Sequence, residues 1–228
     1  MLSSPIRQRR KEARPQELLD AALDLFVEKG FAATRAEEVA ARAGVSKGTL
    51  YLYYPSKEEL LKAVIRERLS NEIQVGALQV EGHEGSNADL MRGLLTQWWL
   101  RMFDSPASGV FKLVVTEVRN FPEIAEFYRQ EVKEPGERLI GRVIERGIAA
   151  GEFRAVNVEA AVHSLVLPMV MLCLHKHSLG VCSPVDSLLH PGDFIRQHID
   201  LMLRGLRPDT GTAEHAPVPK LVARKKSR

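Results

Sequence analysis

Residues 34–57 read TRAEEVAARAGVSKGTLYLYYPSK, and this stretch decides the fold of the chain. Its order of signals predicts two short helices joined by a tight turn. Gly44 stands where the first helix should end, because glycine enters the left-handed backbone region without strain. Ser46 is a good N-cap for the second helix, and Pro55 ends it. That second helix would begin with small and polar side chains, which suits a helix that approaches DNA bases.

Capping signals flank this pair of helices on both sides. Thr34 and Glu37 have the spacing of a capping box, in which a hydroxyl and a carboxylate each accept a free backbone N–H. Ser56 is a cap for a third helix, whose first turn starts with Lys57. The joint order of caps, glycine turn, aromatic residues and proline is typical of a helix-turn-helix.

A longer set of residues around this stretch matches a known family. The matching residues are Phe26, Gly30, Phe31, Thr34, Val39, Ala40, Ala43, Gly44, Val45, Ser46, Gly48, Leu50, Tyr51, Tyr54, Lys57, Leu60 and Leu61. With them, residues 15–65 resemble the DNA-binding domain of the TetR family of transcriptional regulators. The resemblance implies double-stranded DNA as a partner, a homodimer, a small-molecule effector, and repression rather than activation. It names no ligand.

The residues expected to contact DNA lie on or beside the second helix. They are Thr34, Ser46, Lys47, Gly48, Thr49, Tyr51, Tyr53 and Lys57. Lys47 can donate to guanine in the major groove, and Gly48 lets the backbone approach closely. Lys57 would add positive charge beside backbone N–H groups that face the phosphates. The resemblance implies the same roles, whereas Leu52 departs from them because an apolar side chain contacts only sugars or methyl groups.

The whole chain reads as all-α. We expect an N-terminal three-helix helix-turn-helix DNA-binding domain and a C-terminal helical ligand-binding and dimerisation domain. The expected segments are a basic disordered arm (1–13), the DNA-binding domain (14–60), the effector and dimerisation domain (61–207) and a disordered basic tail (208–228). Pro15 suits the first turn of the first helix. The helix from Ser56 should run to about Val80 and link the domains.

Hydrophobic patterns and prolines place the remaining helices. We expect them over 90–103, 110–119, 122–150, 159–177 and 194–206, with a loop over 178–192. Pro135 and Gly136 should kink or interrupt the third of these. The apolar run near 165–174 is shorter than the ~20 residues of a membrane span, so no membrane partner is expected.

Composition and charge place the chain among soluble globular proteins. Residues 1–14 and 207–228 each carry a net charge of +4, so a total of +3 leaves −5 for residues 15–206. The N-terminal arm either reaches DNA phosphates or the minor groove, or is simply a solvated tail. The N-terminus has no apolar core of a secretory signal, and two cysteines make no disulfide framework. A cytoplasmic protein is therefore expected.

Tight binding calls for two copies, because one such domain offers only about 600–1,000 Å² of interface with DNA. A symmetric dimer would read a palindromic operator. The dimer face is assigned to the last two helices, through Leu167, Val170, Leu174, Leu201, Leu203 and Leu206. The family resemblance implies a four-helix bundle of this kind. The alternative is that these faces bury each other within one subunit.

The middle helices hold enough large apolar side chains for a regulatory pocket. The residues assigned to it are Trp98, Trp99, Phe103, Phe111, Phe127, Tyr128, His163, Met169 and Met171. Pockets between helices commonly take apolar or amphipathic ligands. We hypothesise that an effector there moves the helix from Ser56 and changes the spacing of the two DNA-reading helices.

Two other classes of function were weighed. An enzyme is not expected, since the sequence has no Gly-rich phosphate loop, nucleophile elbow or HExxH motif, and Glu145, Glu152 and Glu159 have no paired roles. No cofactor is expected either. A metal-responsive regulator would use Cys173, His175 and His177, with Cys182 nearby. Their spacing fits no standard zinc pattern, so no metal site is assigned.

Overall fold

The computed structural model describes residues 5–117, 119–180 and 190–208, and every element in these ranges is helical. The α-helices are α1 (Pro5–Lys29), α2 (Ala36–Arg42), α3 (Lys47–Tyr53), α4 (Lys57–Ile65), α5 (Asn71–Glu81), α6 (Asn87–Asp104), α7 (Gly109–Glu117), α8 (Pro122–Tyr128), α9 (Glu134–Ala149), α10 (Val158–Leu174) and α11 (Pro191–Leu206). Three π-helical turns extend them, namely η1 (Arg66–Ser70), η3 (Arg129–Lys133) and η4 (His175–Leu179), and η2 (Pro106–Ser108) is a short 3-10 turn. The all-α prediction is confirmed.

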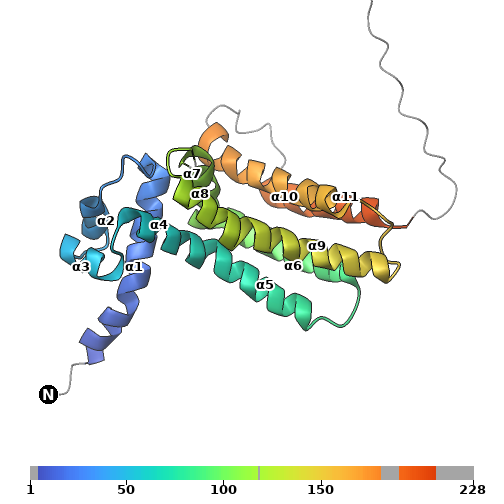
Figure 1. Cartoon of the computed structure of the whole chain (residues 1–228), viewed down its shortest axis with the longest axis horizontal. Coiled ribbons are helices and arrows are strands. Elements are labelled where there is room, and N and C mark those ends of the chain that lie inside the picture. The colour runs from blue at the N-terminus through green and yellow to red at the C-terminus, as the bar shows by residue number, and fades with distance from the viewer. Residues whose placement is uncertain (1–4, 118, 181–189, 209–228) are drawn as a thin grey trace, which may run out of the picture.

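Two groups of helices are visible in Figure 1. Helices α1 to α4 form a small unit at one end, and α5 to α11 form a longer bundle beside it. The small unit is held by side chains with no exposed surface, such as Leu18, Phe26 and Leu50. The rings of Phe26 and Phe31 meet edge-on with centroids 5.2 Å apart. This core fixes the angle at which α3 projects from the molecule.

The first helix begins earlier than the sequence indicated. It starts at Pro5 and carries Pro15 in its interior, so the arm assigned as disordered is helical from residue 5 onward. The stretch between the two prolines is rich in Arg, Lys, Glu and Gln, which all favour helix. Pro15 removes only one N–H from the ladder. Residues 1–4 and the tail 209–228 lie outside the described residues.

The linking helix is confirmed, with one added feature. Helices α4 and α5 are continuous through η1, because Ile65, Arg66, Ser70 and Asn71 all keep right-handed helical dihedrals. The interruption expected at Pro135 and Gly136 is present, because the π turn η3 breaks the regular helix directly before them. Pro135 has no N–H to donate, so a regular i→i−4 hydrogen bond cannot form at this point.

Glu152, in the turn after α9, connects parts of the longer bundle formed by α5 to α11. Its carboxylate accepts hydrogen bonds from Ser86 Oγ (2.8 Å), Asn87 N (3.0 Å), Asn87 Nδ2 (2.7 Å) and Ala88 N (3.2 Å). Partial burial raises the pKa of Glu152, but these donors outweigh it and lower the pKa to about 2. Glu152 therefore caps the free N–H groups of α6 from a distant part of the chain.

The apolar helix α10 lies where the sequence predicted a helix over 159–177. With η4 it forms a helix from Val158 to Ser178, and by length and composition alone it could cross a membrane. The helix continues past the apolar run near 165–174 through His175, Lys176 and His177, as expected. Only 28% of this window is buried in the subunit. Residues 181–189 of the expected loop, with Cys182, lie outside the described residues, and α11 begins at Pro191 rather than Phe194.

Candidate nucleic-acid interface and ligand cavity

The turn between α2 and α3 forms as its glycine and serine predicted. Gly44 has a φ of +66°, and Val45 N donates to Ala40 O at 2.9 Å, which closes α2. Ser46 Oγ accepts from Thr49 N at 3.1 Å and caps α3. Leu50 has no exposed surface and anchors the helix to the core. The opposite face of α3 is left to the solvent.

Exposed side chains of α3 make a surface suited to a DNA groove. Lys47 is exposed, forms an ion pair with Glu37 of α2, and lies 5.7 Å from the ring centroid of Tyr51. Leu52 is 85% exposed, the most exposed large apolar side chain of the described residues. An apolar side chain so placed can contact thymine methyl groups. Leu52 departs from the polar pattern expected of a DNA-contacting face. Its exposure could have been predicted from the helical periodicity of α3.

The hydroxyl of Thr34 is not available to DNA. It is buried and donates to Leu25 O (3.2 Å) and Gly30 O (2.8 Å), so it closes the end of α1. The capping box of α2 also lies one residue later than expected, because Arg35 N donates to Glu38 Oε2 at 3.0 Å. Both assignments to Thr34, as a cap and as a phosphate contact, are corrected.

The ammonium of Lys57 is also directed inward. It donates to Phe31 O (2.8 Å), Ala32 O (3.2 Å) and Thr34 O (3.0 Å), and it lies 4.5 Å from the centroid of the Phe31 ring. A lysine has three donors, and these carbonyls take all of them. The assignment of Lys57 to a phosphate contact is therefore corrected: it fastens the α1–α2 loop to α4.

The two bundles meet along α1, α7 and α8. Lys112 Nζ donates to Val27 O at 3.1 Å near the end of α1. A Cβ at Gly109 would lie 2.4 Å from Val27, so only glycine permits this approach. The rings of Phe31 and Phe121 meet edge-on, 4.8 Å apart. The DNA-binding unit is thus packed directly on the bundle that contains the cavity.

A cavity of about 110 Å³ lies among α5, α6, α7, η3, α9 and α10. Four predicted residues line it, namely Trp98, Trp99, Phe111 and Tyr128. Burial, with a smaller contribution from the negative charge of Glu137, raises the pKa of Tyr128 to about 12. Tyr128 therefore keeps its proton and can donate a hydrogen bond into the cavity, which Glu72, Lys133 and Glu137 line together with apolar side chains.

Five residues assigned to the pocket lie elsewhere. Met169 is buried in the core and Met171 is 55% exposed. His163 Nε2 lies 3.2 Å from Glu137 Oε1, in a groove outside the cavity. Phe127 lies beneath Arg66, and Phe103 lies beneath Lys176, each with a cation over its ring. Apolar composition did not show which face of each helix points inward.

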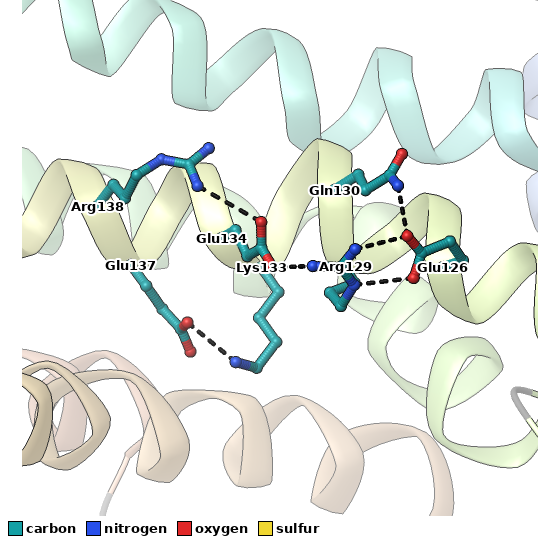
Figure 2. Close-up of polar contacts among 7 residues, drawn as sticks. All are labelled: Glu126, Arg129, Gln130, Lys133, Glu134, Glu137 and Arg138. Atoms are coloured by element: carbon teal, nitrogen blue, oxygen red, sulfur yellow. Dashed lines mark hydrogen bonds and ion pairs between the residues drawn. The ribbon is translucent and has the colours of Figure 1, made fainter.

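The wide turn η3 forms one wall of the cavity and is held by charged pairs (Figure 2). Arg129 pairs with Glu126 three residues earlier and with Glu134 five residues later. Residues five apart lie about 140° apart around an α-helix, but they become neighbours where the turn is widened to i→i+5 bonding. Hydrogen bonding to Glu126 raises the pKa of Arg129, so its charge is permanent. The pairs therefore favour the π turn over a regular helix.

Comparison with known proteins gives the family. Residues 18–64 match the family described as "Bacterial regulatory proteins, tetR family", and residues 83–180 match "Tetracyclin repressor-like, C-terminal domain". The chain belongs to the TetR family of transcriptional regulators. Its curated relatives include an HTH-type transcriptional regulator, YfiR of Bacillus subtilis (strain 168), which is 29% identical over 74% of this chain and 82% of its own.

Individual relatives of this TetR-family chain include regulators named for fatty acids. The HTH-type transcriptional repressor KstR2 of Rhodococcus jostii (strain RHA1) is 31% identical over 86% of this chain and 92% of its own. The fatty acid degradation regulator FadR of Bacillus halodurans has a TM-score of 0.69 at 18% identity, over 91% and 99% of the two chains. FadR of Bacillus subtilis, solved with stearoyl-CoA, has a TM-score of 0.62 at 16% identity, over 84% and 99%. At these identities the two solved structures show the fold alone.

The side chains assigned to a dimer face differ in how far they are exposed in this TetR-family chain. Leu167 of α10 and Leu201 of α11 are 60% and 68% exposed. Val170 and Leu174 are partly buried, and Val170 lines the cavity. Leu203 and Leu206 are buried in the subunit, on the helix that packs against α6, and their assignment to the dimer face is corrected.

The proposed metal ligands do not converge among the described residues. No group of three His, Cys, Asp or Glu side chains is placed to hold an ion there. Cys173 is buried, and burial raises the pKa of its thiol to about 12, so it stays protonated. His177 Nε2 lies 2.8 Å from Ser108 Oγ, which ties η4 to the start of α7. Cys182, the remaining candidate ligand, lies outside the described residues.

Proposed function

We propose that this TetR-family chain is a repressor that binds a palindromic operator as a homodimer and is released by a small apolar or amphipathic effector. The observation that carries the proposal is the arrangement of α3. Its polar and apolar side chains are exposed on one face, and its other face is anchored to the core. That core is continuous with the helices around the cavity.

The exposed face of α10 and α11 supports a homodimer. Leu167, Met171 and Leu201 are all more than half exposed. Charged side chains lie beside Leu201, where Arg204 Nε donates to Asp200 Oδ2 at 2.7 Å. An apolar face bordered by charges is typical of a protein interface rather than of a lipid contact. We therefore assign this face to a second copy of the chain.

The cavity supports a ligand that carries an apolar group. About 110 Å³ is below the usual 300–1,000 Å³ of a ligand site, so a ligand must push the walls apart as it enters. One wall contains Ile73 at the start of α5, directly after η1. Displacement of α5 would turn α4 with it, because the helix is continuous across η1. A fatty acyl thioester is the first class to test, since one structural neighbour was solved with stearoyl-CoA.

Operator selection and ligand titration test this function. Duplexes selected from a random pool by the purified protein should contain an inverted repeat, and sedimentation should show two chains per duplex. Acyl-CoA thioesters of graded chain length should then weaken operator binding in fluorescence anisotropy by at least about tenfold. A single subunit that ignores duplex DNA at low ionic strength contradicts the repressor. Operator affinity that is indifferent to every compound bound in the cavity contradicts release.

A further inference from the structure

Helix α3 directs an apolar ridge away from the rest of the protein. Leu50 has no exposed surface and marks the face of α3 that packs on the core. Successive residues of an α-helix lie about 100° apart, so Gly48 and Leu52 both fall within about 20° of the opposite face. Gly48 is exposed, and Leu52 is 85% exposed. These two residues, four apart and therefore neighbours on the helix surface, form the part of α3 that would enter a groove most deeply.

Nothing inside the subunit requires a glycine at position 48. Gly48 is absent from the glycines with positive φ, in contrast to Gly44. A Cβ added to Gly48 would meet only Ser46 Oγ, at an ordinary contact distance of 3.8 Å. Glycine is nevertheless less favourable than alanine in a helix, because it loses more backbone entropy on folding. The open space over Gly48 is therefore suited to a group from outside the protein that approaches beside the Leu52 side chain.

The polar side chains at the start of α3 lie away from this ridge or are engaged with one another. Ser46 Oγ accepts from Thr49 N and lies 2.9 Å from Thr49 Oγ1, so the two hydroxyls share a hydrogen bond. Lys47 lies about 140° around the helix from Leu52 and forms an ion pair with Glu37. The centre of the exposed face thus presents an apolar side chain that can neither donate nor accept a hydrogen bond.

The chemistry of the major groove limits what this ridge can recognise. The base edges there present hydrogen-bond donors and acceptors, and the one apolar group among them is the C5 methyl of thymine. A donor or acceptor placed against a leucine side chain would lose water without gaining a partner. Cytosine and uracil have only a hydrogen at C5, so they offer less apolar surface than thymine or 5-methylcytosine. The ridge therefore favours a pyrimidine that carries a 5-methyl group.

We propose that Gly48 and Leu52 form a binding site for the methyl group of one 5-methylpyrimidine per bound subunit. The methyl group lies over Gly48 and against the Leu52 side chain. This inference rests on the proposed function only in placing α3 in the major groove. It deepens that function by naming a chemical group that the operator must present, and it makes Leu52 a determinant of specificity through an apolar contact.

Fluorescence anisotropy of the full chain on its selected operator, without effector, tests the inference. Each thymine of the operator is replaced in turn by uracil, which removes the methyl group and keeps the hydrogen-bonding groups of the base. At one thymine of each half-site the change should weaken binding about threefold to tenfold, as the loss of one buried methyl group does. Replacing that thymine–adenine pair with a cytosine–guanine pair should weaken binding as well. Methylation of the cytosine at C5 should then recover about threefold to tenfold.

Two variants assign this preference to the ridge. Leu52→Ala should bind the thymine and uracil operators within about twofold of each other, because no side chain remains to cover the methyl group. Gly48→Ala should also lose the preference, since its own methyl group occupies the open space. Tyr51→Phe is the matched control on the same helix, because it removes only a hydroxyl group and should keep the full penalty for uracil. All three positions are exposed, so the variants should fold.

Three outcomes overturn the inference. In the first, uracil replaces every thymine of the operator without loss of affinity, as it would if Leu52 covered only a sugar. In the second, the penalty for uracil is equal in the unaltered protein and in Leu52→Ala. In the third, 5-methylcytosine binds no better than cytosine. A protein that binds no duplex overturns the proposed function together with this inference, whereas a tightly bound operator that tolerates uracil overturns this inference alone.

Discussion

Lys57 acts within the protein, and its ion–dipole contacts explain why the α1–α2 loop keeps its shape. Three backbone carbonyls converge on one ammonium group, and the face of Phe31 lies against it. These carbonyls belong to the loop after α1, and Phe31 O also accepts from Thr34 N at 3.3 Å. A charged donor at this point contributes more than a neutral one, because bonds to a charged group are stronger. The orientation of α2, and through it of α3, depends on this contact.

Replacing Lys57 with methionine keeps the aliphatic stem and removes all three donors. The free energy of unfolding should fall by about 1 kcal/mol, since part-buried carbonyls lose a charged donor. The dependence of DNA affinity on salt should be unchanged, because no phosphate contact is removed. Urea unfolding and anisotropy at several salt concentrations measure the two effects. An unchanged stability with a salt slope smaller by about one unit would restore Lys57 to the phosphates.

Lys47 has the opposite role, because its ammonium lies on the exposed surface of α3. Lys47→Ala should weaken operator binding by about 1–3 kcal/mol and relax the preference at one base position. Glu37→Gln should strengthen binding, since Glu37 pairs with Lys47 in the free protein and would face the phosphates. Arg142→Ala, an exposed change on α9, is the control. Anisotropy against single-base operator variants gives the answer, and an unchanged preference for Lys47→Ala means that α3 does not read bases.

Contacts between residues close together in the sequence could be predicted, and contacts between distant residues could not. Gly44, Ser46 and Ser56 act on backbone groups within three residues, so the sequence alone reveals them. The partners of Lys57 lie 23 to 26 residues away, and the partners of Thr34 lie on α1. A sequence pattern shows that such a residue is polar, but not whether its polar atoms face the solvent or the core.

Among the elements, helix α6 has free N–H groups at its start that are capped by an acceptor in the turn after α9. Its own cap, Ser86, satisfies Asp89 N, and Glu152 satisfies the N–H groups of Asn87 and Ala88. The negative carboxylate also lies at the positive end of the helix dipole. Since α6 carries Trp98 and Trp99, the cap holds one wall of the cavity.

Glu152→Gln should lower the free energy of unfolding by about 1 kcal/mol at neutral pH, as the loss of a helix cap does. The pKa of Glu152 is lowered from its usual 4.5 to about 2. Its stabilisation is therefore complete above about pH 4.5 and is lost as pH falls toward 2. Thermal unfolding of both proteins across this range should converge at the acid end. Glu123→Gln, an exposed change on α8, is the control, and a difference independent of pH would contradict the carboxylate's role.

Elements with regular periodicity were predictable, and their irregular turns were not. The boundaries of α4–α5 and α10 agree with the apolar pattern to within a few residues. The π turns η1 and η3 have no such signal, because a single extra residue in a turn leaves the composition unchanged. An ion pair such as Arg129 with Glu134 can be predicted from the sequence only if a π turn is already assumed.

At the scale of the whole molecule, the operator is expected to be read by two subunits whose separation is set by α10 and α11. Leu201→Glu should weaken the dimer about a hundredfold, because the symmetry places two new charges in one interface. Operator binding should fall with it. Leu78→Glu is the matched control, since Leu78 is 70% exposed on α5. Analytical ultracentrifugation measures the equilibrium, and equal effects of the two changes would show that this face is not the contact.

The sequence predicted an apolar pocket in the second domain, but not which residues line it. Aromatic residues on α6, α7 and α8 indicated a pocket, and Trp98, Trp99, Phe111 and Tyr128 lie in it. Phe103 and Phe127 serve instead as surfaces for nearby cations.

The unbroken helix through α4, η1 and α5 has a practical consequence for hybrid regulators. A designer who grafts another DNA-binding unit at Ser70 must preserve the number of residues across the junction. One inserted residue would rotate the grafted unit by about 100° and advance it by about 1.5 Å. Exchanges that keep the length of η1 should give sensors that answer to the same ligand at a new promoter, and exchanges that alter it should give proteins that fold yet cannot align their two halves on one stretch of DNA.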